Sequence, residues 1–223
     1  MEYRIGVDEA GRGPMFGRVY AAAVVLPDNL SGTEYDQIKD SKKFTSKTKL
    51  RNIANYIQKH AIAYGIAYED EVCIDRNNIL QATQTAMHSA IDQVLEKLGD
   101  KWNAINTYLE IDGNYFRMHP EINHQCFEGG DATHKNIAAA SILAKLSRDD
   151  YIDELCRDYP YLSEKYALNK NYGYGTKQHM DAIRQWGITK WHRRTFGICK
   201  TAPFYSNAET STISTSAGMG CGG

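Results

Sequence analysis

Four acidic residues stand where a predicted strand ends or a predicted helix begins: Asp8, Glu9, Asp112 and Asp131. Folded proteins seldom bring like charges together unless a cation or another positive group holds them. Two divalent ions about 3.5–4 Å apart need several oxygen ligands that converge from different elements. Mg²⁺ prefers such ligands and also binds phosphate oxygens. Together these residues predict a metal site for a phosphodiester, although each one alone also fits an ordinary turn or helix start.

A glycine-rich turn with one arginine follows the first acidic pair. Gly11 and Gly13 let the backbone approach a ligand closely, and Arg12 adds a guanidinium beside the carboxylates. Lys42 and Lys43 precede a predicted helix and are candidates for phosphate contact, although a solvated lysine pair is the ordinary interpretation. Positive charge near the acidic residues favours an anionic substrate.

The last part of the chain combines aromatic and basic side chains. Gly173 and Gly175 flank Tyr174, which predicts a loop that presents an aromatic ring. Arg193 and Arg194 form a basic cluster among aromatic residues. Because rings stack on bases or sugars while arginines contact phosphates, this pattern favours a nucleic-acid surface. The alternative is a small helical subdomain with a solvated basic face.

The elements that must position these residues follow from hydrophobic periodicity. Apolar, β-rich runs predict strands at 3–7, 18–26, 61–68, 107–111 and 122–128. Helical spacing predicts helices at 47–59, 79–97, 137–146, 151–158 and 177–186. Asn78 is expected to cap the second of these helices. The order β-β-α-β-α-β-β-α, followed by helices, predicts an α/β fold whose first two strands pair antiparallel.

Length and composition fit a globular protein. The 223 residues, 42% of them hydrophobic, suffice for one domain with a packed core. A net charge of -1 neither demands nor excludes nucleic acid. No segment approaches the ~20 apolar residues of a membrane span, and the N-terminus has no signal-peptide layout. The five cysteines are scattered, which argues against a disulfide framework or a zinc site. We therefore predict a cytoplasmic protein.

The domain organisation is expected to be simple. Residues 1–204 are predicted to form one domain, whose C-terminal part is helical from about residue 148. Residues 205–223 are rich in Ser, Thr and Gly and contain almost no apolar bulk. Such a segment cannot bury enough apolar surface to offset the entropy of ordering it, so we predict a disordered tail.

The motifs also occur in the order typical of a known family. The chain resembles the type 2 ribonucleases H, specifically ribonuclease HII, at residues 6–14 (GVDEAGRGP), 40–43 (DSKK), 78–83 (NILQAT), 111–114 (IDGN), 130–131 (GD), 137–145 (IAAASILAK), 148–149 (RD), 173–176 (GYGT) and 192–194 (HRR). The resemblance covers nearly everything up to about residue 200. It implies a ribonuclease H-like fold, with a mixed five-stranded sheet flanked by helices and a helical C-terminal extension.

The resemblance implies an activity as well. The expected reaction is endonucleolytic cleavage of RNA paired with DNA, including cleavage 5′ to a single ribonucleotide within duplex DNA, for ribonucleotide excision repair and primer removal. Hydrolysis with two divalent ions, Mg²⁺ or Mn²⁺, would leave 3′-hydroxyl and 5′-phosphate ends. By position, the family's metal-binding carboxylates correspond to Asp8, Glu9, Asp112 and Asp131.

Substrate recognition is also implied by position. Gly11, Arg12 and Gly13 match the loop that reads the ribose 2′-hydroxyl, mainly with backbone groups. Tyr174 matches the tyrosine that stacks on the sugar of the next deoxynucleotide at an RNA–DNA junction. The expected partners are RNA–DNA hybrids and ribonucleotide-containing duplex DNA. We expect a monomer, and no tail for binding a sliding clamp is evident.

Two positions depart from the family pattern. The family usually has a short run with serine and lysine after its Gly-Asp pair, whereas this chain has Ala132-Thr-His-Lys135. Lys135 is therefore the candidate replacement for a lysine near the site. Tyr172 stands where the family tends to have a lysine. These departures leave the carboxylates unchanged but affect the expected rate and metal preference.

Three alternative interpretations compete with this one. Ribonuclease HIII would require an extra N-terminal substrate-binding domain and lacks support because Asp8 lies almost at the start of the chain. A hybrid-binding protein without catalysis predicts a missing carboxylate, whereas all four are present. Another nuclease of the same fold, such as a resolvase, is opposed by the Gly-Arg-Gly turn and by Tyr174.

Overall fold

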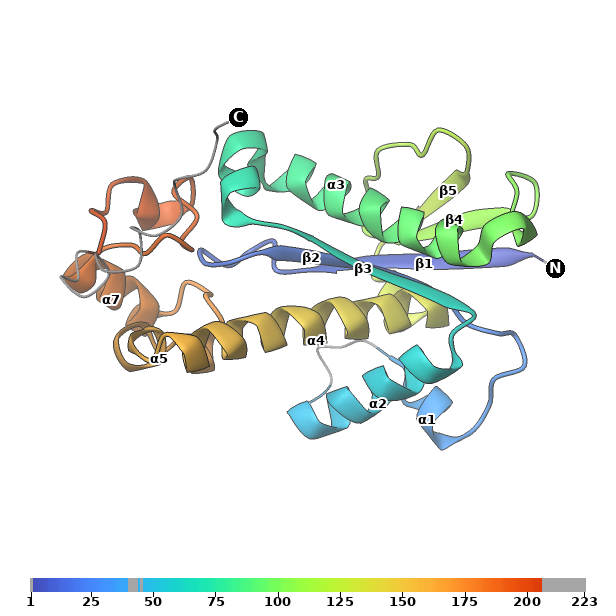
Figure 1. Cartoon of the computed structure of the whole chain (residues 1–223), viewed down its shortest axis with the longest axis horizontal. Helices are drawn as coiled ribbons and strands as arrows, with labels where there is room; N and C mark the ends of the chain where they lie inside the picture. Colours follow the sequence, from blue (N-terminus) through green and yellow to red (C-terminus); the bar gives the residue numbers. More distant parts are fainter. Residues whose placement is uncertain (1, 40–43, 45, 206–223) are drawn as a thin grey trace, which may run out of the picture.

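The described chain, residues 2–39, 44 and 46–205 of a computed structural model, folds around one five-stranded sheet (Figure 1). The strands are β1 (Tyr3–Ala10), β2 (Val19–Val25), β3 (Ala63–Glu69), β4 (Thr107–Asp112) and β5 (Asn123–Phe127). Their order in the sheet is β3-β2-β1-β4-β5. β2 pairs antiparallel with β1 and β3, whereas β4 pairs parallel with β1 and β5. The predicted mixed five-stranded sheet is confirmed.

Helices cover both faces of this sheet. They are α1 (Thr33–Asp36), α2 (Lys47–His60), α3 (Glu71–Leu98), α4 (Lys135–Asp158), α5 (Tyr161–Tyr166), α6 (Leu168–Asn171) and α7 (Lys177–Trp186). In Figure 1, α3 lies on one face of the sheet, and α2 and α4 lie on the other. Across the described parts of the chain, no helix is both long and apolar enough to cross a membrane.

Two helices are longer than the periodicity predicted. Asp70 caps a first turn of α3 by accepting from the backbone N–H of Cys73 at 2.8 Å. Asn78 then interrupts the helix with φ 67° and caps the remainder, because its side chain accepts from the N–H of Gln81 at 3.1 Å. The predicted cap is therefore present, inside a kinked helix rather than at its start. α4 runs without a break through the two helices predicted at 137–146 and 151–158.

Small side chains on β2 let helices pack closely on both faces. Successive residues of a strand point to opposite faces of the sheet. Ala21 and Ala23 accordingly lie in the apolar cluster with α3, whereas Ala22 and Val24 lie in the cluster with α2 and α4. The sheet therefore has one apolar layer on each side.

The start of α4 approaches β1 so closely that only glycine fits at position 6. A Cβ added to Gly6 would lie 2.1 Å from the backbone carbon of Asn136. The Asn136 side chain also accepts from the N–H of Leu26 at 2.9 Å and donates to the carbonyl of Arg4 at 3.0 Å. These contacts fix α4 against the sheet and thereby determine which of its side chains lie next to Asp8.

The C-terminal helices pack against the second half of α4 and the turn after β1. Phe16 from that turn shares an apolar cluster with Ile152, Tyr166 and Trp191. Figure 1 shows α5 and α7 together at one end of the molecule. Tyr205, the first residue of the predicted tail, donates its N–H to the carbonyl of Ile188 at 2.7 Å, so it is paired with the folded domain.

The rest of the predicted tail, residues 206–223, lies outside the described residues. The four described cysteines, Cys73, Cys126, Cys156 and Cys199, are free thiols. The boundary of the single domain predicted over residues 1–204 stays a prediction.

Candidate active site

Parallel pairing of β1 with β4 brings the predicted acidic residues to one edge of the sheet. Val7 pairs with Ile111, so Asp8 and Asp112 follow at the same level of two neighbouring strands. Asp131 lies beside them, because its backbone N–H donates to Asp112 Oδ1 at 3.4 Å. Residues separated by more than 100 positions in the sequence are therefore neighbours in the fold.

A hollow of about 180 Å³ opens at this edge. Its lining residues come from β1, the glycine turn, β4, α4 and the Tyr174 loop: Asp8, Glu9, Ala10, Gly11, Asp112, Ser141, Lys145, Arg148 and Tyr174. Asp131 is buried next to the hollow rather than in its lining. The structure thus brings three predicted carboxylates, the glycine turn and the predicted aromatic ring to one place.

The carboxylates of the hollow repel one another. Asp8 is only 4% exposed, and burial together with the charges of Glu9 and Asp112 raises its pKa well above the usual value. A hydrogen bond from Ser141 acts in the opposite direction on that pKa. Burial also raises the pKa of Glu9, against the opposing charge of Arg12, whose Nη1 lies 3.5 Å from Glu9 Oε1. A cation placed between the carboxylates would relieve this repulsion.

The donor chemistry fits a hard divalent cation. Carboxylate oxygens delivered from β1 and β4 are the ligands that Mg²⁺ and Mn²⁺ prefer. Among residues 2–39, 44 and 46–205, no three His, Cys, Asp or Glu side chains are spaced as a finished metal-ligand cluster. The side chains would therefore adjust around an ion. Asp8, Glu9 and Asp112 are the candidates for direct ligands, with Asp131 beside them.

A fully buried arginine holds the glycine turn. Arg193 has 0% exposure, and its guanidinium donates to backbone carbonyls over distances of 2.6 to 3.1 Å. The accepting residues are Gly11, Arg12, Pro14, Gly17 and Arg18. Burial and the nearby Arg148 lower the pKa of Arg193 to about 9, which leaves it charged at neutral pH. The expectation that Arg193 contacts substrate is corrected, because its donors are already used inside the protein.

Three residues of α4 to which no sequence pattern assigned a role complete the hollow. Ser141, Lys145 and Arg148 are four and three positions apart, a spacing that places them on one face of a helix. Lys145 Nζ lies 2.6 Å from Asp149 Oδ2. The signal that could have found them is a set of polar side chains at helical spacing that begins inside the apolar run 137–146.

Arg148 also connects the two loops that border the hollow. Its guanidinium donates to the carbonyl of Tyr172 at 2.8 Å and to that of Phe16 at 3.4 Å. A Cβ added to Gly11 would lie 2.3 Å from Arg148 Nε, and Gly11 has φ 97°. Both the close approach and the left-handed backbone require glycine at this position.

Tyr174 lies beside the glycine turn with 48% of its surface exposed. A Cβ added to Gly13 would lie 3.7 Å from Tyr174 Cε1. The loop backbone is joined to the turn as well, since the N–H of Met15 donates to the carbonyl of Gly173 at 2.8 Å. The glycine turn and the aromatic loop therefore form one continuous border of the hollow.

The remaining predicted substrate residues are placed differently. Arg12 is exposed at the rim, beside Glu9. Arg194 is exposed, and its guanidinium carbon lies 4.5 Å from the centre of the Phe204 ring. Lys42 and Lys43 lie outside the described residues. Only Arg12 among them is observed next to the carboxylates.

The two departures from the family pattern have clear surroundings. Lys135 Nζ donates to the carbonyls of Tyr35 at 3.0 Å and Ile38 at 2.8 Å, so it anchors the segment around α1. It is therefore not a replacement for a lysine at the hollow. The lysine that lines the hollow is Lys145, and its Nζ lies 5.4 Å from the centre of the Tyr172 ring.

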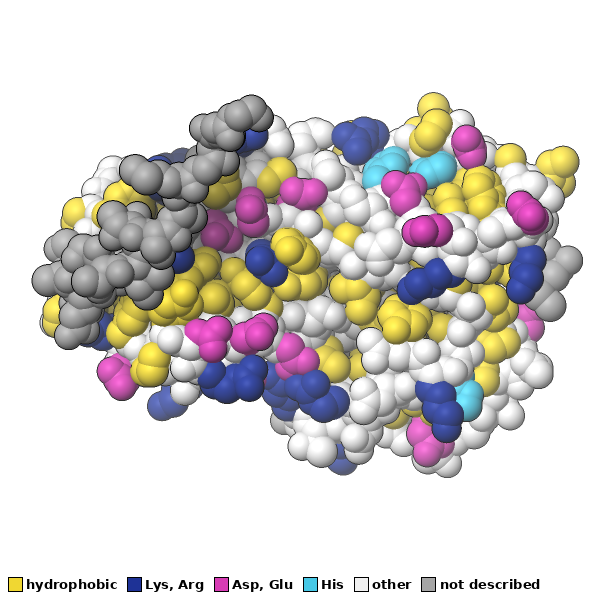
Figure 2. Space-filling view, viewed as in Figure 1, with side chains coloured by type: hydrophobic (Ala, Val, Ile, Leu, Met, Phe, Trp, Pro, Cys, Tyr) yellow, Lys and Arg dark blue, Asp and Glu magenta, His cyan; other side chains and the backbone are white. Residues whose placement is uncertain are grey.

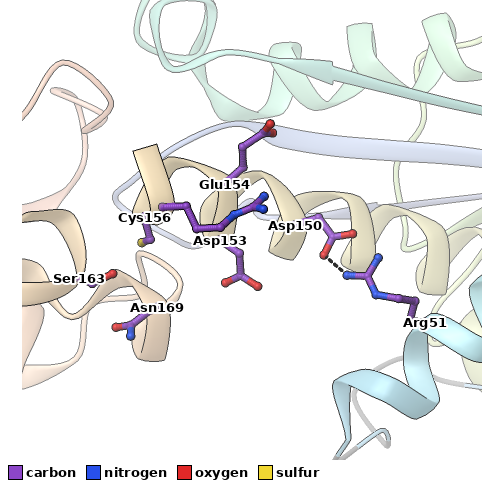
Figure 3. Close-up of a pocket in the computed structure, with 8 residues that line it drawn as sticks. Arg51, Asp150, Asp153, Glu154, Cys156, Ser163 and Asn169 are labelled. Atoms are coloured by element: carbon purple, nitrogen blue, oxygen red, sulfur yellow. Dashed lines mark hydrogen bonds and ion pairs between the residues drawn. The ribbon is translucent and has the colours of Figure 1, made fainter. Parts of the chain in front are cut away.

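A second hollow, of about 680 Å³, lies on the outer side of α4. Figure 3 shows its lining, which comprises Arg51, Asp150, Asp153, Glu154, Cys156, Arg157, Ser163 and Asn169. Arg51 Nη2 lies 2.5 Å from Asp150 Oδ1, and Lys47 pairs with Asp153. Acidic and basic side chains gather side by side over this helix (Figure 2). These ion pairs join α2 to α4, and none of the predicted carboxylates takes part.

Comparison with known proteins gives one consistent result. A family model described as Ribonuclease HII matches residues 5–199. A ribonuclease HII from Bacteroides thetaiotaomicron is 42% identical over 193 residues, which cover 86% of this chain and 88% of that protein.

Solved structures agree on the fold. Ribonuclease H2 from Pyrococcus horikoshii OT3 matches with a TM-score of 0.65 and 19% identity, over 89% of this chain and 95% of that one. Bst-RNase HIII in complex with Mn²⁺ matches with a TM-score of 0.58 and 21% identity, over 70% of this chain and 55% of that one. At these identities the likeness extends to the fold, and both matches support the ribonuclease H-like architecture.

Proposed function

The chain belongs to the ribonuclease HII family, and from that premise we propose that it cleaves duplex DNA 5′ to a single embedded ribonucleotide as well as RNA within RNA–DNA hybrids. As a member of this family it is a metal-dependent hydrolase of the ribonuclease H type. The observation that supports the finer proposal is the joint lining of one hollow by carboxylates, the glycine turn and Tyr174. The same substrates would give it a role in ribonucleotide excision repair and primer removal.

The proposed ligands of the divalent ions, Mg²⁺ or Mn²⁺, are Asp8, Glu9, Asp112 and Asp131. The chemistry that two such ions supply is activation of water and stabilisation of negative charge on the leaving 3′-oxygen, which leaves a 5′-phosphate. The chain itself excludes bulk water from Asp8 by burial, and its raised carboxylate pKa values favour binding of a cation that offsets the repulsion. Arg12 and Lys145 add positive charge beside the position of the scissile phosphate.

Selection of ribose over deoxyribose is assigned to the backbone of Gly11, Arg12 and Gly13. The 2′-hydroxyl is the group that distinguishes RNA from DNA at a single position. A rigid backbone discriminates best, because polar groups built to bind a hydroxyl are left unpaired when the hydroxyl is missing. The hydrogen bonds that Arg193 donates to this turn supply the rigidity.

Recognition of the junction is assigned to Tyr174. Its half-exposed ring stands next to Gly13 at the border of the hollow, where a nucleotide that follows the ribonucleotide would pass. Stacking on a sugar needs a flat apolar face held in one orientation. The predictions of a monomer and of a cytoplasmic location stay predictions.

Cleavage of three labelled duplexes tests this proposal. The substrates are all-DNA, DNA with one embedded ribonucleotide, and a long RNA–DNA hybrid, each with Mg²⁺ or Mn²⁺. We expect cleavage 5′ to the single ribonucleotide and within the hybrid, and none of the all-DNA duplex. Asp8→Asn should lower kcat by about 10³-fold or more, because a metal-binding carboxylate is lost.

A matched control variant distinguishes the loss of a site carboxylate from a general effect on the fold. Glu110→Gln changes a different buried carboxylate, which lies on β4 and pairs with Arg4, and this variant should retain activity. Asp8→Asn should be at least as thermally stable as the wild type without metal, because it removes repulsion with Glu9 and Asp112. Cleavage of the hybrid alone would refute junction recognition. If none of the three duplexes is cleaved with either Mg²⁺ or Mn²⁺, the enzymatic proposal is refuted.

A further inference from the structure

Two buried histidines lie directly behind the Tyr174 loop. His179, near the start of α7, is 0% exposed, and His192, in the segment after α7, is 1% exposed. Their Nε2 atoms are 3.1 Å apart, within hydrogen-bonding distance. A pair of imidazoles this close and this buried must share one proton between the facing nitrogens.

The outer partners of the pair determine where its protons are. His179 Nδ1 lies 3.0 Å from the carbonyl oxygen of Tyr174, which can only accept, so this nitrogen carries a proton. His192 Nδ1 receives the backbone N–H of Thr189 at 2.9 Å, so this nitrogen carries none. Hence neutral His192 donates from Nε2, and neutral His179 accepts at Nε2. One assignment of tautomers satisfies all four ring nitrogens.

This assignment disfavours a further proton on either ring. Protonating His179 would set two N–H groups against each other at the facing Nε2 atoms. Protonating His192 at Nδ1 would set an N–H against the backbone N–H of Thr189 and leave only the Thr189 hydroxyl, whose Oγ1 lies 2.9 Å from Nδ1, as an acceptor. The rings of Phe16 and Tyr166 pack against His192, and the Tyr166 hydroxyl donates to the carbonyl of Gly187. The pKa of His179 and the pKa of His192 are both lowered, chiefly by burial.

The hydrogen-bonded chain ends on the backbone of the loop that carries Tyr174. It runs from Thr189 through His192 and His179 to the Tyr174 carbonyl. The same loop is held from the other side by Arg148, which donates to Tyr172. The loop backbone is therefore clamped between two sets of donors, while the Tyr174 ring remains exposed.

We propose that His179 and His192 are positioning residues, a neutral pair with fixed tautomers that holds the Tyr174 backbone and so orients the ring for the sugar after the ribonucleotide. The role of the ring rests on the proposed function, whereas the geometry of the pair does not. Neither histidine touches the substrate or the reacting atoms. Their contribution is to keep the ring from moving by the ångström or so that degrades alignment at a reacting centre.

Nitrogen-15 NMR of the histidine rings tests the pair directly. We expect His179 protonated at Nδ1, His192 protonated at Nε2, and both neutral at about pH 6, below the ordinary histidine pKa of about 6.5. Either ring charged at that pH in the folded protein, or either tautomer reversed, would overturn the proposal. This measurement needs no substrate, so its result is independent of the proposed function.

Two substitutions at one position test the positioning role. His179→Asn keeps an amide donor near the place of Nδ1, whereas His179→Leu removes the donor to the Tyr174 carbonyl. His179→Leu should lower kcat/KM for the single-ribonucleotide duplex about tenfold, relative to the long hybrid, and shift the Tyr174 amide resonance. His179→Asn should stay within about threefold of the wild type.

The control is His119→Leu, which removes a buried histidine that stacks on His88, away from α7. It should leave the ratio of the two activities unchanged. Equal effects of His179→Asn and His179→Leu, or no change of ratio in His179→Leu, would refute the positioning role. A wild-type protein that cleaves neither substrate would refute the proposed function, and the Tyr174 amide shift would still decide whether the pair positions the loop.

Discussion

At the scale of single residues, Arg193 shows how a charge that suggests nucleic acid can serve the fold. Its position in a basic cluster beside aromatic residues favoured contact with phosphate. In the structure the guanidinium is enclosed and donates to carbonyls of the glycine turn. A turn whose carbonyls point inward needs a donor with several N–H groups in fixed directions, and arginine is the side chain that provides them.

Arg193→Lys tests this role. A lysine cannot reach all of those carbonyls, so buried acceptors lose partners, and we expect the free energy of unfolding to fall by about 2–4 kcal/mol. Activity should also fall, because the glycine turn becomes less ordered. The slope of log binding constant against log salt concentration should stay unchanged, because no phosphate contact is removed.

Arg194, the next residue in the chain, allows the salt dependence of binding to be compared between two neighbouring arginines. Its guanidinium is exposed over Phe204, and it stays a predicted substrate residue. If it contacts phosphate, Arg194→Ala should reduce the salt slope by about one unit without destabilising the fold. A reduced slope in Arg193→Lys measured under conditions where the variant is folded would contradict the structural role.

At the scale of elements, the site depends on where α4 lies relative to β1. β1 delivers Asp8, and α4 delivers Ser141, Lys145 and Arg148 to the same hollow. Their separation is set by the close approach at Gly6. On the opposite face, Gly65 of β3 allows an equally close approach of α3, where an added Cβ would lie 2.1 Å from the carbonyl oxygen of Ala90.

Gly6→Ala and Gly65→Ala form a matched pair. Each added methyl group collides with helix backbone at the same distance, so each should cost about 1–3 kcal/mol of stability. Only Gly6→Ala displaces the helix that borders the carboxylates. At a temperature where both variants are folded, we expect kcat to fall about tenfold or more in Gly6→Ala and to change little in Gly65→Ala. Equal losses of kcat would show that the placement of α4 is not what matters.

At the scale of the whole molecule, the C-terminal helices and the turn after β1 are one packed unit. Phe16 of that turn contacts His192 and forms an isolated β-bridge with it. Arg193, next in the chain, holds the turn itself. The far C-terminal segment therefore stabilises the loop that is proposed to read ribose, so the site and the helical part should unfold together.

This arrangement predicts a pH dependence of stability. The folded-state pKa of His179 and of His192 lies below the ordinary value, so the unfolded chain binds more protons as pH falls below about 6.5. Stability should therefore decrease towards acid, by up to about 1.4 kcal/mol per pH unit for each histidine. The raised pKa of Asp8 and of Glu9 acts in the opposite sense, adding stability as pH falls.

Denaturant unfolding at several pH values separates these contributions. The acid loss should be reduced in the double variant His179→Asn/His192→Asn and retained in His60→Asn, which replaces an exposed histidine. An acid slope that is identical in the double variant and the wild type would mean that the buried pair is not its source.

The amino-acid sequence by itself determined the strands, most helices, the antiparallel first pair and the carboxylates at the strand ends. Alternation and helical spacing are local properties, because they follow from backbone geometry that repeats every two or 3.6 residues. Asn78 was recognised as a cap for the same reason, since its partner is three residues away. The order of the motifs then identified the family.

Only the tertiary structure decided what distant polar side chains bind. Arg193 reaches carbonyls about 180 positions earlier in the chain, and Ser141, Lys145 and Arg148 gain a role because α4 docks on β1. The histidine pair acquires its tautomers from partners on two different segments. Whether a polar group faces water, substrate or a buried carbonyl depends on which remote backbone lies beside it, and no local pattern encodes that.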